Sequence, residues 1–329
     1  MKAVWFESFG SPSDVLIFGE LEKPGIQANE VLVKMYTSGV NPSDVKKRAG
    51  AFPALLDDGL VIPHSDGAGI IEEVGSQVDC TRVGERVFVY QAQYGRRMGS
   101  SAEYLAIESL RAPPLPDNAS FDVGACVGIP IMTAHRCVFA DGAVAGKTVL
   151  VTGGAGRVGY YAIQWAKNAG ARVIATASNQ ADKDLCIAMG ASAVVNHREK
   201  DWSLAVNDAA HGTKIDRVID VEFGANLTEI LKCIAISGTI VTYSSTVVPE
   251  PKLPFRDMMF MDLNIRMVIV YAMPEEAKAA AVADTIAALN AGTLHHRIAA
   301  GLPFAEMAKA HELIEQSTAK GCVVVRINE

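Results

Sequence analysis

The sequence predicts an α/β protein with two domains, one a doubly wound parallel sheet and the other rich in short strands. The first observation is an alternation of buried-strand and helical patterns over residues 125–267, which is typical of a parallel sheet covered by helices on both faces. The second is a glycine-rich turn at residues 153–159, directly between a strand pattern and a helical pattern. The third is the density of short strands, glycines and prolines before residue 124, which is typical of an antiparallel or barrel-like unit.

The predicted first domain covers residues 1–124 and is built mainly from strands. Residues 31–35, 69–74 and 86–90 have strand composition and are separated by glycine and proline. A cluster of prolines in residues 111–120 then interrupts the pattern. We therefore place a domain boundary shortly after it.

The predicted second domain covers residues 125–267. Its strand patterns occupy residues 147–152, 171–177, 193–196, 216–221, 238–243 and 265–270. Residues 268–329 hold two helical patterns and a closing strand at 322–327, and we assign them to the first domain. Ligands of open α/β sheets bind outside the carboxyl ends of the strands, so we expect the site in a cleft between the two domains.

The glycine-rich turn is predicted to bind a dinucleotide. In this interpretation Gly154 permits a tight turn, Gly156 lets the backbone approach a pyrophosphate, and Gly159 lets the helix pack on the strand. The pyrophosphate then meets free N–H groups at the helix N-terminus. The whole loop is the candidate site: Gly154, Ala155, Gly156, Arg157, Val158 and Gly159. Arg157 is expected either to reach the pyrophosphate or to pair with an acidic neighbour.

The residues after the second and third strands of this domain favour NADPH over NADH. NAD sites usually place an acidic residue about 20 positions beyond the glycines, and this chain has Ser178 there. Lys183, His197 and Arg198 can supply positive charge to a 2′-phosphate. The alternative is that Lys183 and Arg198 are ordinary solvated surface charges.

Composition excludes several classes of protein. With 329 residues and 50% hydrophobic content, the chain is long and apolar enough for two folded domains. A formal net charge of -7 argues against nucleic acid or an anionic membrane as partner. The 6 cysteines lack the spacing of a metal site. The longest apolar runs are too short to span a bilayer, and the N-terminus has the pattern of a strand and not of a signal peptide. We expect a cytoplasmic protein without a metal ion.

The chain resembles the medium-chain dehydrogenase/reductase superfamily, in its zinc-free quinone oxidoreductase (zeta-crystallin-like) branch. The matching segments, besides the glycine loop, are residues 39–44, 62–69, 72–75, 83–87, 102–104, 128–134, 196–199 and 310–312. The resemblance implies a GroES-like first domain that carries the substrate site and a Rossmann second domain that binds NADPH.

Zinc-dependent members of that superfamily hold the catalytic metal with residues that this chain lacks. Asn41, Ser65 and Ile129 stand at those positions, and they cannot supply a set of thiolates and imidazole. His64 is a neighbour of one such position, and we do not expect it to bind a metal ion. Without a Lewis acid, the feasible reaction is reduction of an acceptor that is already electrophilic, such as a quinone or an enone.

By resemblance, four residues of the first domain are candidate catalytic residues: Asn41, Asp44, Lys46 and Arg48. Asn41 and Asp44 are expected near the nicotinamide side of the site, with an Asx-type turn around Pro42 as the alternative. Lys46 replaces a tyrosine that many relatives have, and Arg48 is expected to hydrogen-bond a reduced oxygen.

Three further cofactor residues are implied by the resemblance. Thr133 is expected to contact the nicotinamide or ribose, and Ser244 and Ser245 are expected to line the nicotinamide pocket. In the first domain, Tyr90 and Tyr94 are weaker candidates for the acceptor site, with surface-loop aromatics as the alternative.

The leading functional hypothesis is an NADPH-dependent quinone reductase. Its rivals are an NADPH-dependent reductase of alkenals or enones and a non-catalytic NADPH-binding protein. The physiological acceptor and the choice between hydride and one-electron transfer stay open. A homodimer is expected through the edge strand at residues 262–270, because a bare apolar edge strand invites aggregation.

Overall fold

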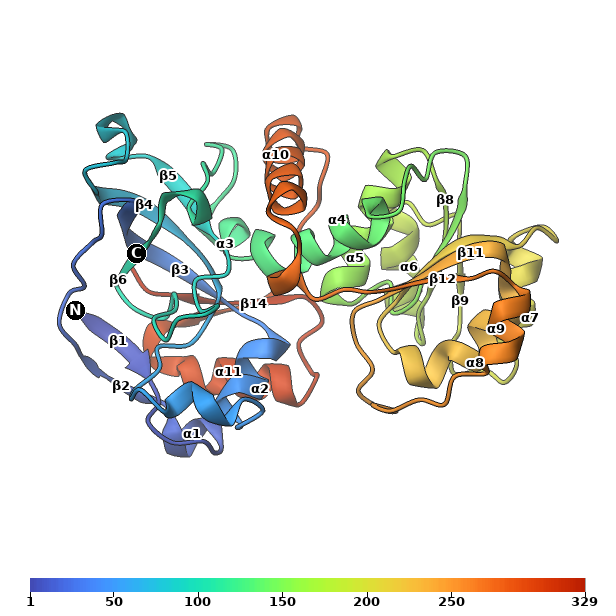
Figure 1. Ribbon diagram of the computed structural model, residues 1–329, viewed down its shortest axis with the longest axis horizontal. Helices are drawn as coiled ribbons and strands as arrows, with labels where there is room; N and C mark the ends of the chain where they lie inside the picture. The colour runs from blue at the N-terminus through green and yellow to red at the C-terminus, as the bar shows by residue number, and fades with distance from the viewer. Residues whose placement is uncertain (329) are drawn as a thin grey trace. The chain divides into compact units, whose positions relative to one another are not determined.

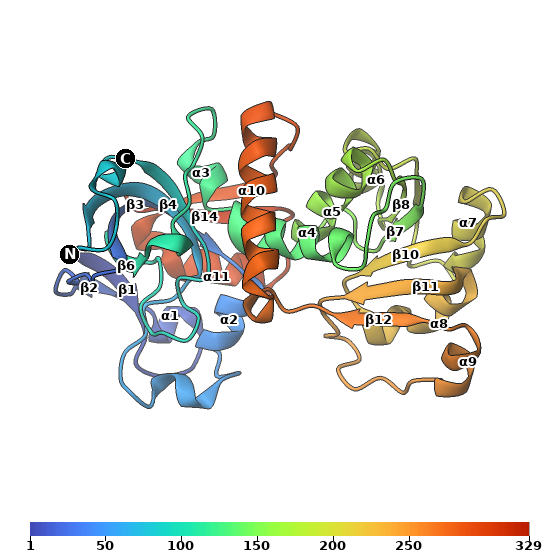
Figure 2. The same cartoon turned by 45° about the horizontal axis from the view of Figure 1, so that its top comes forward.

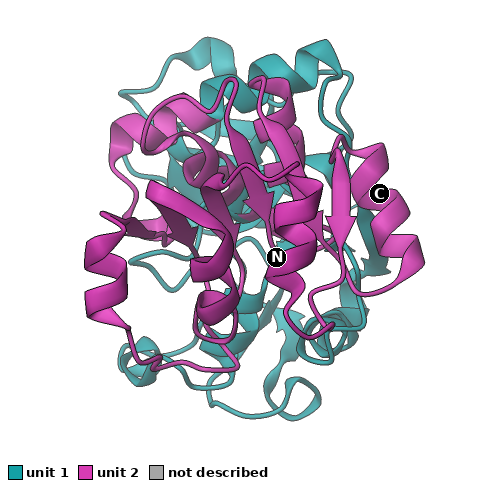
Figure 3. Ribbon diagram, turned by 90° about the vertical axis from the view of Figure 1, so that its right-hand side faces the viewer, with its two compact units in different colours: residues 1–129, 282–329 teal, residues 130–281 magenta. Residues whose placement is uncertain are grey.

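The computed structural model describes residues 1–328, and the chain divides into two compact units. Unit 1 comprises Met1–Ile129 and Val282–Glu329, and unit 2 comprises Pro130–Ala281 (Figure 3). Both boundaries lie further along the chain than the expected residues 124 and 267. At the first one, a π-helical segment, Val127–Ile131, leads directly into helix α4 (Met132–Phe139). The proline cluster therefore precedes the boundary without forming it.

Unit 1 is built on a sheet with strand order β13-β14-β3-β4-β5, with β6 also pairing with β3. Its strands are β3 (Glu30–Val40), β4 (Asp66–Val74), β5 (Arg86–Val89), β6 (Tyr104–Glu108), β13 (Ile298–Pro303) and β14 (Cys322–Arg326). All pairs are antiparallel except β13 with β14. β1 (Lys2–Trp5) and β2 (Ile17–Glu20) form a separate hairpin-like pair. The last strand of the chain thus joins the first domain's sheet, as the sequence predicts.

Helices of unit 1 cover this sheet. They are α1 (Pro12–Val15), α2 (Pro42–Arg48), α3 (Phe121–Gly124) and α11 (Met307–Glu315), with α2 and α11 side by side in Figure 1. α2 begins where Pro42, which has no N–H to lose, follows the extended Asn41. One apolar cluster packs α11 against β14 through Met307, Ile314 and Val325.

Unit 2 is a six-stranded parallel sheet with the order β12-β11-β10-β7-β8-β9. The strands are β7 (Thr148–Val151), β8 (Arg172–Thr176), β9 (Ala193–Val195), β10 (Ile215–Asp220), β11 (Ile234–Thr242) and β12 (Asn264–Met267). This confirms the predicted doubly wound Rossmann sheet. Figure 2 shows β10, β11 and β12 side by side. β12 is shorter than the expected strand, because the chain turns into a 3₁₀ helix at Val270–Ala272.

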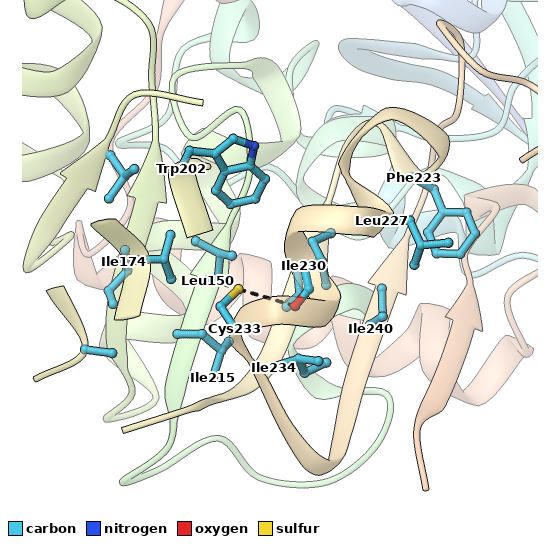
Figure 4. Close-up of a cluster of buried hydrophobic side chains, with 14 residues drawn as sticks. Leu150, Ile174, Trp202, Ile215, Phe223, Leu227, Ile230, Cys233, Ile234 and Ile240 are labelled. Carbon is cyan, nitrogen blue, oxygen red and sulfur yellow. Dashed lines mark hydrogen bonds between the residues drawn. The ribbon is translucent and has the colours of Figure 1, made fainter. Parts of the chain in front are cut away.

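Helices connect the strands of unit 2: α5 (Arg157–Asn168), α6 (Gln180–Ala188), α7 (Trp202–Ala209), α8 (Phe223–Cys233) and α9 (Phe255–Phe260). α7 and α8 bury Trp202, Phe223 and Leu227 against strand residues such as Leu150 and Ile240 (Figure 4). The remaining helix, α10 (Glu275–Ala291), crosses the second unit boundary. Within residues 1–328, no helix combines the length and the apolar character that crossing a membrane requires.

Candidate functional site

The glycine loop joins β7 to α5. The Gly156 N–H donates to the Gly153 carbonyl oxygen at 2.9 Å, so Gly154 is a central residue of a tight turn. Gly153, which the sequence analysis did not single out, has a φ of +60° and supplies the left-handed conformation before that turn. A Cβ on Gly154 would lie 2.9 Å from Ala175 Cβ, Cys186 Sγ and Ile163 Cδ1. Gly154 is therefore required for close packing beneath the loop.

The next two glycines bring α5 to the loop. Gly156 is the N-cap residue of α5, and a Cβ there would contact only the Gly153 carbonyl oxygen, at 3.1 Å. A Cβ on Gly159 would overlap with that same oxygen. The first turn of α5 begins at Arg157, and in an α-helix the N–H groups of the first turn point out of the helix end. Together with the half-buried Ala155 and Val158, these residues form the kind of helix N-terminus that binds a pyrophosphate.

The parallel sheet gathers the other predicted cofactor residues along one edge. Ser178 follows β8, Lys183 lies in α6, and His197 and Arg198 follow β9. Because the carboxyl ends of parallel strands share one edge, these segments lie on the side that carries the glycine loop. Ser178, Lys183 and His197 are half-buried, and Arg198 is exposed. Burial and the nearby Arg198 lower the pKa of His197.

Ser244 and Ser245 follow β11 at the same edge, but their hydroxyls are already bonded to partners in their own loop and at the start of α8. Ser245 Oγ accepts from the Gly224 N–H at 2.9 Å and donates to the Val248 carbonyl at 2.6 Å. Ser244 Oγ lies 3.2 Å from Thr246 Oγ1. Both hydroxyls therefore help to shape this loop. Thr133 lies buried at the start of α4, which packs against α5.

Asp220, at the end of β10, is a buried residue of this edge that the sequence analysis missed. Its Oδ1 accepts from Thr152 Oγ1 at 2.6 Å and from Asn226 Nδ2 at 2.8 Å. Burial raises its pKa. A carboxylate at the carboxyl end of a predicted strand was the available signal. The contact ties the ends of β7 and β10 together beside the glycine loop.

In unit 1, Asn41 joins two buried carboxylates. Its backbone N–H donates to Asp44 Oδ2 at 2.8 Å, and its Nδ2 donates to Asp66 Oδ2 at 2.9 Å. The backbone N–H of Ile129 donates to the same Asp66 oxygen at 2.8 Å. The side chain of Asp66 lies over Gly128, where a Cβ would overlap with Asp66 Oδ1. Asn41 and Asp44 are thus brought together, with Asp66 as an unpredicted third member.

Lys47 adds a cation to these carboxylates. Its Nζ donates to the Gln93 carbonyl at 2.8 Å and to Gln93 Oε1 at 3.0 Å. Burial raises the pKa of Asp66 to about 8 and that of Asp44 to about 6, although Lys47 opposes both shifts. Burial likewise lowers the pKa of Lys47. We call Asn41, Asp44, Lys47 and Asp66 the acid cluster.

The two other predicted catalytic residues are not part of the acid cluster. Lys46 is exposed on α2. Arg48 is 1% exposed, and its guanidinium is bonded to the Glu315 carboxylate and the Gly10 carbonyl. Arg48 therefore has its hydrogen-bond partners inside unit 1.

The tyrosine candidates also differ from each other. Tyr90 is buried, and its hydroxyl donates to the Leu110 carbonyl at 3.3 Å. Tyr94 is 49% exposed, and it follows Gln93, the residue that Lys47 holds. Of the pair, Tyr94 is the side chain that a ligand can reach.

A chain of hydrogen bonds that ends at the Asp66 carbonyl includes His64 and His311, two of the three histidines in the matching segments. His311 Nε2 lies 2.9 Å from His64 Nε2, and His64 Nδ1 lies 2.8 Å from Ser38 Oγ. Ser38 Oγ lies 2.8 Å from Ser100 Oγ, which donates to the Asp66 carbonyl at 2.6 Å. Burial lowers the pKa of His64 to about 3 and lowers that of His311 as well. Residues 1–328 contain no group of three or more His, Cys, Asp or Glu side chains arranged to hold a metal ion.

Comparison with known proteins identifies both parts of the chain. Residues 27–117 match the model of the alcohol dehydrogenase GroES-like domain, and residues 158–287 match that of the zinc-binding dehydrogenase family. The quinone oxidoreductase of Rattus norvegicus is 31% identical over 97% of this chain and 95% of its own. The 2-methylene-furan-3-one reductase of Solanum lycopersicum is 30% identical over 76% of this chain and 63% of its own. A mycobacterial protein solved in complex with NADPH superimposes with a TM-score of 0.88 at 26% identity, covering 99% of this chain and 100% of that one.

Proposed function

Because the chain belongs to the quinone oxidoreductase branch of the medium-chain dehydrogenase/reductase superfamily, we propose that it transfers reducing equivalents from NADPH to a quinone without a catalytic zinc ion. The observation that carries this proposal is the edge of the parallel sheet. There, a glycine loop at a helix N-terminus stands beside Ser178 and basic side chains. This combination suits a dinucleotide with a 2′-phosphate.

The residues present fit NADPH. The N–H groups at the start of α5 would receive the pyrophosphate, and Gly156 leaves the backbone open on that side. Ser178 stands where NAD sites usually have an acidic residue, so no carboxylate repels a 2′-phosphate there. Lys183 and Arg198 supply positive charge. When bound, NADPH would supply the reducing equivalents. The similarity to the mycobacterial protein solved with NADPH supports the same cofactor.

The donor set in unit 1 supports a zinc-free reaction. Asn41 uses its amide to hold Asp66, and Ile129 offers only its backbone N–H to that carboxylate. Ser65 stands at the third position where zinc-dependent relatives have a ligand. These groups do not make a catalytic zinc site. A site of this kind suits an acceptor that is already electrophilic, because the reduction of such an acceptor does not require a Lewis acid.

Reduction of an enone is the second candidate function. It uses the same cofactor and fold, and the similarity to the tomato 2-methylene-furan-3-one reductase favours it. Both reactions place negative charge on an acceptor oxygen, and both consume one proton. The two are distinguished by the acceptor that reacts faster.

We further propose that the protein is a cytoplasmic homodimer. β12 is the edge strand of the parallel sheet, and near it Phe260, Met267 and Ile269 are 70%, 70% and 57% exposed. Pairing β12 with its copy would cover this apolar edge. The cysteines at positions 80, 126, 137, 186, 233 and 322 are free thiols, which suits a reducing compartment.

The test is oxidation of NADPH by the purified protein after treatment with a chelator. We expect rapid turnover with 1,4-naphthoquinone, slower turnover with crotonaldehyde, and slower turnover still when NADH replaces NADPH. Faster reaction with crotonaldehyde would transfer the assignment to the enone reductase. Loss of activity on chelation, restored by zinc, would contradict the zinc-free reaction.

A further inference from the structure

Glu222 lies between β10 and α8, and its carboxylate binds three successive backbone N–H groups of another loop. Its Oε2 accepts from the Thr246 N–H at 2.9 Å, and its Oε1 accepts from the N–H groups of Val247 at 2.9 Å and of Val248 at 3.4 Å. Successive backbone N–H groups that converge on one point form a nest, which binds anions. Here the anion is a side chain of the same unit, so the nest joins two segments of unit 2.

The second of these segments is the loop that follows β11, residues 243–248, which we call the β11 loop. Two further hydrogen bonds join it to the start of α8. The Phe223 N–H donates to the Ser244 carbonyl at 3.0 Å, and the Gly224 N–H donates to Ser245 Oγ at 2.9 Å. The β11 loop and the start of α8 are therefore joined along several residues, with Glu222 bound to the tip.

The tip of the β11 loop depends on polar contacts for its shape. Thr246 is exposed, and Val247 and Val248 are 75% and 37% exposed, so no buried side chain fixes the tip. Segments with few buried apolar contacts have low local stability. The backbone of Val248 lies close to Gly224, where a Cβ would overlap with the Val248 carbonyl oxygen. The Glu222 carboxylate and this close approach at Gly224 therefore decide the shape of the tip.

The residues directly before Glu222 contact the glycine loop. The Val221 N–H donates to Thr152 Oγ1 at 3.0 Å, and Thr152 Oγ1 donates to Asp220 Oδ1 at 2.6 Å. A Cβ on Gly153 would lie 2.9 Å from Val221 Cγ1. Glu222 thus stands at the end of a segment that is fixed to the glycine loop on one side and bonded to the β11 loop on the other.

The strand order gives the β11 loop a place relative to the cofactor. β7, which carries the glycine loop, lies between β8 and β10, and β11 is next to β10. In sheets of this kind the pyrophosphate binds at the helix after the first strand, and the adenosine ribose is held after the second. These strands are β7 and β8 here. The nicotinamide half of NADPH would therefore extend the other way, toward the ends of β10 and β11.

We propose that Glu222 is a positioning residue for the nicotinamide half of NADPH: its carboxylate keeps the β11 loop in the shape that receives this half. This inference rests on the proposed function, but only on its cofactor. Without the carboxylate, the N–H groups of the nest lose their shared acceptor and the tip adopts other shapes as well. The apparent affinity for a ligand then falls with the fraction of molecules that keep the binding shape.

Glu222→Gln tests the proposal, because it removes the charge and one acceptor oxygen and keeps the size of the side chain. If about one molecule in ten keeps the binding shape, the Kd for NADPH should rise about tenfold. Fluorescence titration of the full-length protein measures it. In turnover the loss should lie in the KM for NADPH and not in kcat, because the bound complex holds the same loop shape.

Adenosine 2′,5′-bisphosphate provides the readout that a merely structural role would not give. It carries the 2′-phosphate but lacks the nicotinamide half, so it should contact the β8 side of the edge and not the β11 loop. Its Kd in Glu222→Gln, measured by calorimetry, should stay within about twofold of the wild-type value, which also shows that the variant is folded. An equal loss of affinity for both ligands would overturn the proposal.

Gly224→Ala releases the β11 loop in a second way, with Glu222 intact. Its Cβ would overlap with the Val248 carbonyl oxygen, so the tip must move, and the affinities should change as they do in Glu222→Gln. Because both substitutions act on one loop, the double variant should bind NADPH no more than about twofold more weakly than the weaker single variant. Losses that multiply would contradict a shared action through the loop.

Glu229→Gln is the matched control on the same helix. Glu229 Oε2 accepts from the Ser203 N–H at 3.1 Å and from Ser203 Oγ at 2.6 Å, so its carboxylate also joins α8 to another segment, but not to the β11 loop. Both affinities should stay within about twofold of the wild type. Unchanged NADPH affinity in Glu222→Gln and Gly224→Ala would overturn the proposal. A wild type that bound NADPH but reduced no quinone would refute the proposed function instead, and the two affinities would still decide the role of Glu222.

Discussion

The two units differ in where they place most of their candidate residues. In unit 2 most of them lie on the loops after the strands or in the helices that follow, beside an apolar cluster that includes Leu150, Trp202 and Ile240 (Figure 4), although Asp220 at the end of β10 is buried. In unit 1 the candidate residues are themselves part of the interior, and Asp44 and Asp66 are fully buried. The cofactor side is thus a loop site on an ordinary core, whereas the acid cluster replaces part of the core of unit 1.

This difference has an energetic meaning. An apolar core stabilises the fold by roughly 25 cal/mol for each Å² that it removes from water. Buried charges cost free energy unless hydrogen bonds and opposite charges offset the loss of water. The bonds from Asn41, Ile129 and Gln93 reduce this cost but leave two carboxylate oxygens without partners. Unit 1 therefore gives up stability at the acid cluster, whereas the carboxyl edge of the unit 2 sheet buries a single carboxylate, Asp220, with one oxygen unpartnered.

The largest effect on the cofactor side is expected from adding one methyl group to the glycine loop of unit 2. In Gly159→Ala the new Cβ would overlap with the Gly153 carbonyl oxygen, so both the loop and α5 must shift. We expect NADPH affinity to fall about 100-fold and the free energy of unfolding to fall by about 3 kcal/mol. Fluorescence titration and urea unfolding measure the two effects.

Gly156→Ala is the matched control for Gly159→Ala. Its Cβ would meet only the Gly153 oxygen, at 3.1 Å, so the free energy of unfolding should change by less than about 1 kcal/mol. NADPH affinity should still fall, because the methyl group stands where the pyrophosphate approaches. If Gly156→Ala bound NADPH normally, the loop would not be the pyrophosphate site.

A second methyl group, in Gly128→Ala, tests whether the acid cluster is packed as tightly as a core. The new Cβ would overlap with Asp66 Oδ1, and we expect a loss of about 2 kcal/mol in the free energy of unfolding. In a double-mutant cycle with Asp66→Ala, which removes the clashing carboxylate, most of that loss should disappear. Additive losses would show that Gly128 and Asp66 do not compete for one space.

The pH dependence of stability separates the units further. Burial raises the pKa of Asp66 to about 8 in the folded state, whereas an aspartate in the unfolded chain has a pKa of about 3.8. Between these pH values only the folded state holds the proton, so the free energy of unfolding falls as pH rises. Asp44 contributes in the same direction only up to about pH 6.

The difference in free energy of unfolding between Asp66→Asn and the wild type should therefore shift by about 2 kcal/mol in favour of the variant from pH 6 to pH 8. The buried histidines titrate in both proteins, so their contribution cancels in the difference. Urea unfolding at the two pH values measures it. A constant difference between wild type and variant would mean that Asp66 is ionised in the folded protein at pH 6.

The same contrast explains what could be predicted from the sequence. The residues at the edge of unit 2 follow strand ends, and strands are visible in the hydrophobic pattern, so Ser178 and His197 were placed without any tertiary information. Gly153 was missed because several adjacent glycines can each make a turn. The choice among them depends on which one packs against Ala175 and Cys186.

The acid cluster could not be assembled in this way. Its contacts join residues far apart in the chain, such as Asn41 with Asp66 and Asp66 with Ile129. On α2, consecutive residues point about 100° apart, so the orientation of the helix about its axis that buries Lys47 also exposes Lys46. A hydrophobic pattern does not distinguish between two adjacent lysines. The buried lysine was therefore passed over in favour of the exposed one.

The smallest expected effect concerns the edge of unit 2, where the residues can be exchanged without disturbing a core. Ser178→Asp restores a carboxylate after β8, which would accept from a ribose 2′-hydroxyl and repel a 2′-phosphate. We expect kcat/KM with NADPH to fall about tenfold and that with NADH to rise, with the unfolding free energy unchanged within about 0.5 kcal/mol. Ser192→Asp, at an exposed position before β9, is the control. If both variants kept the NADPH preference of the wild type, the preference would have to come from Lys183 and Arg198 alone, and the double variant Lys183→Met/Arg198→Met would then decide it.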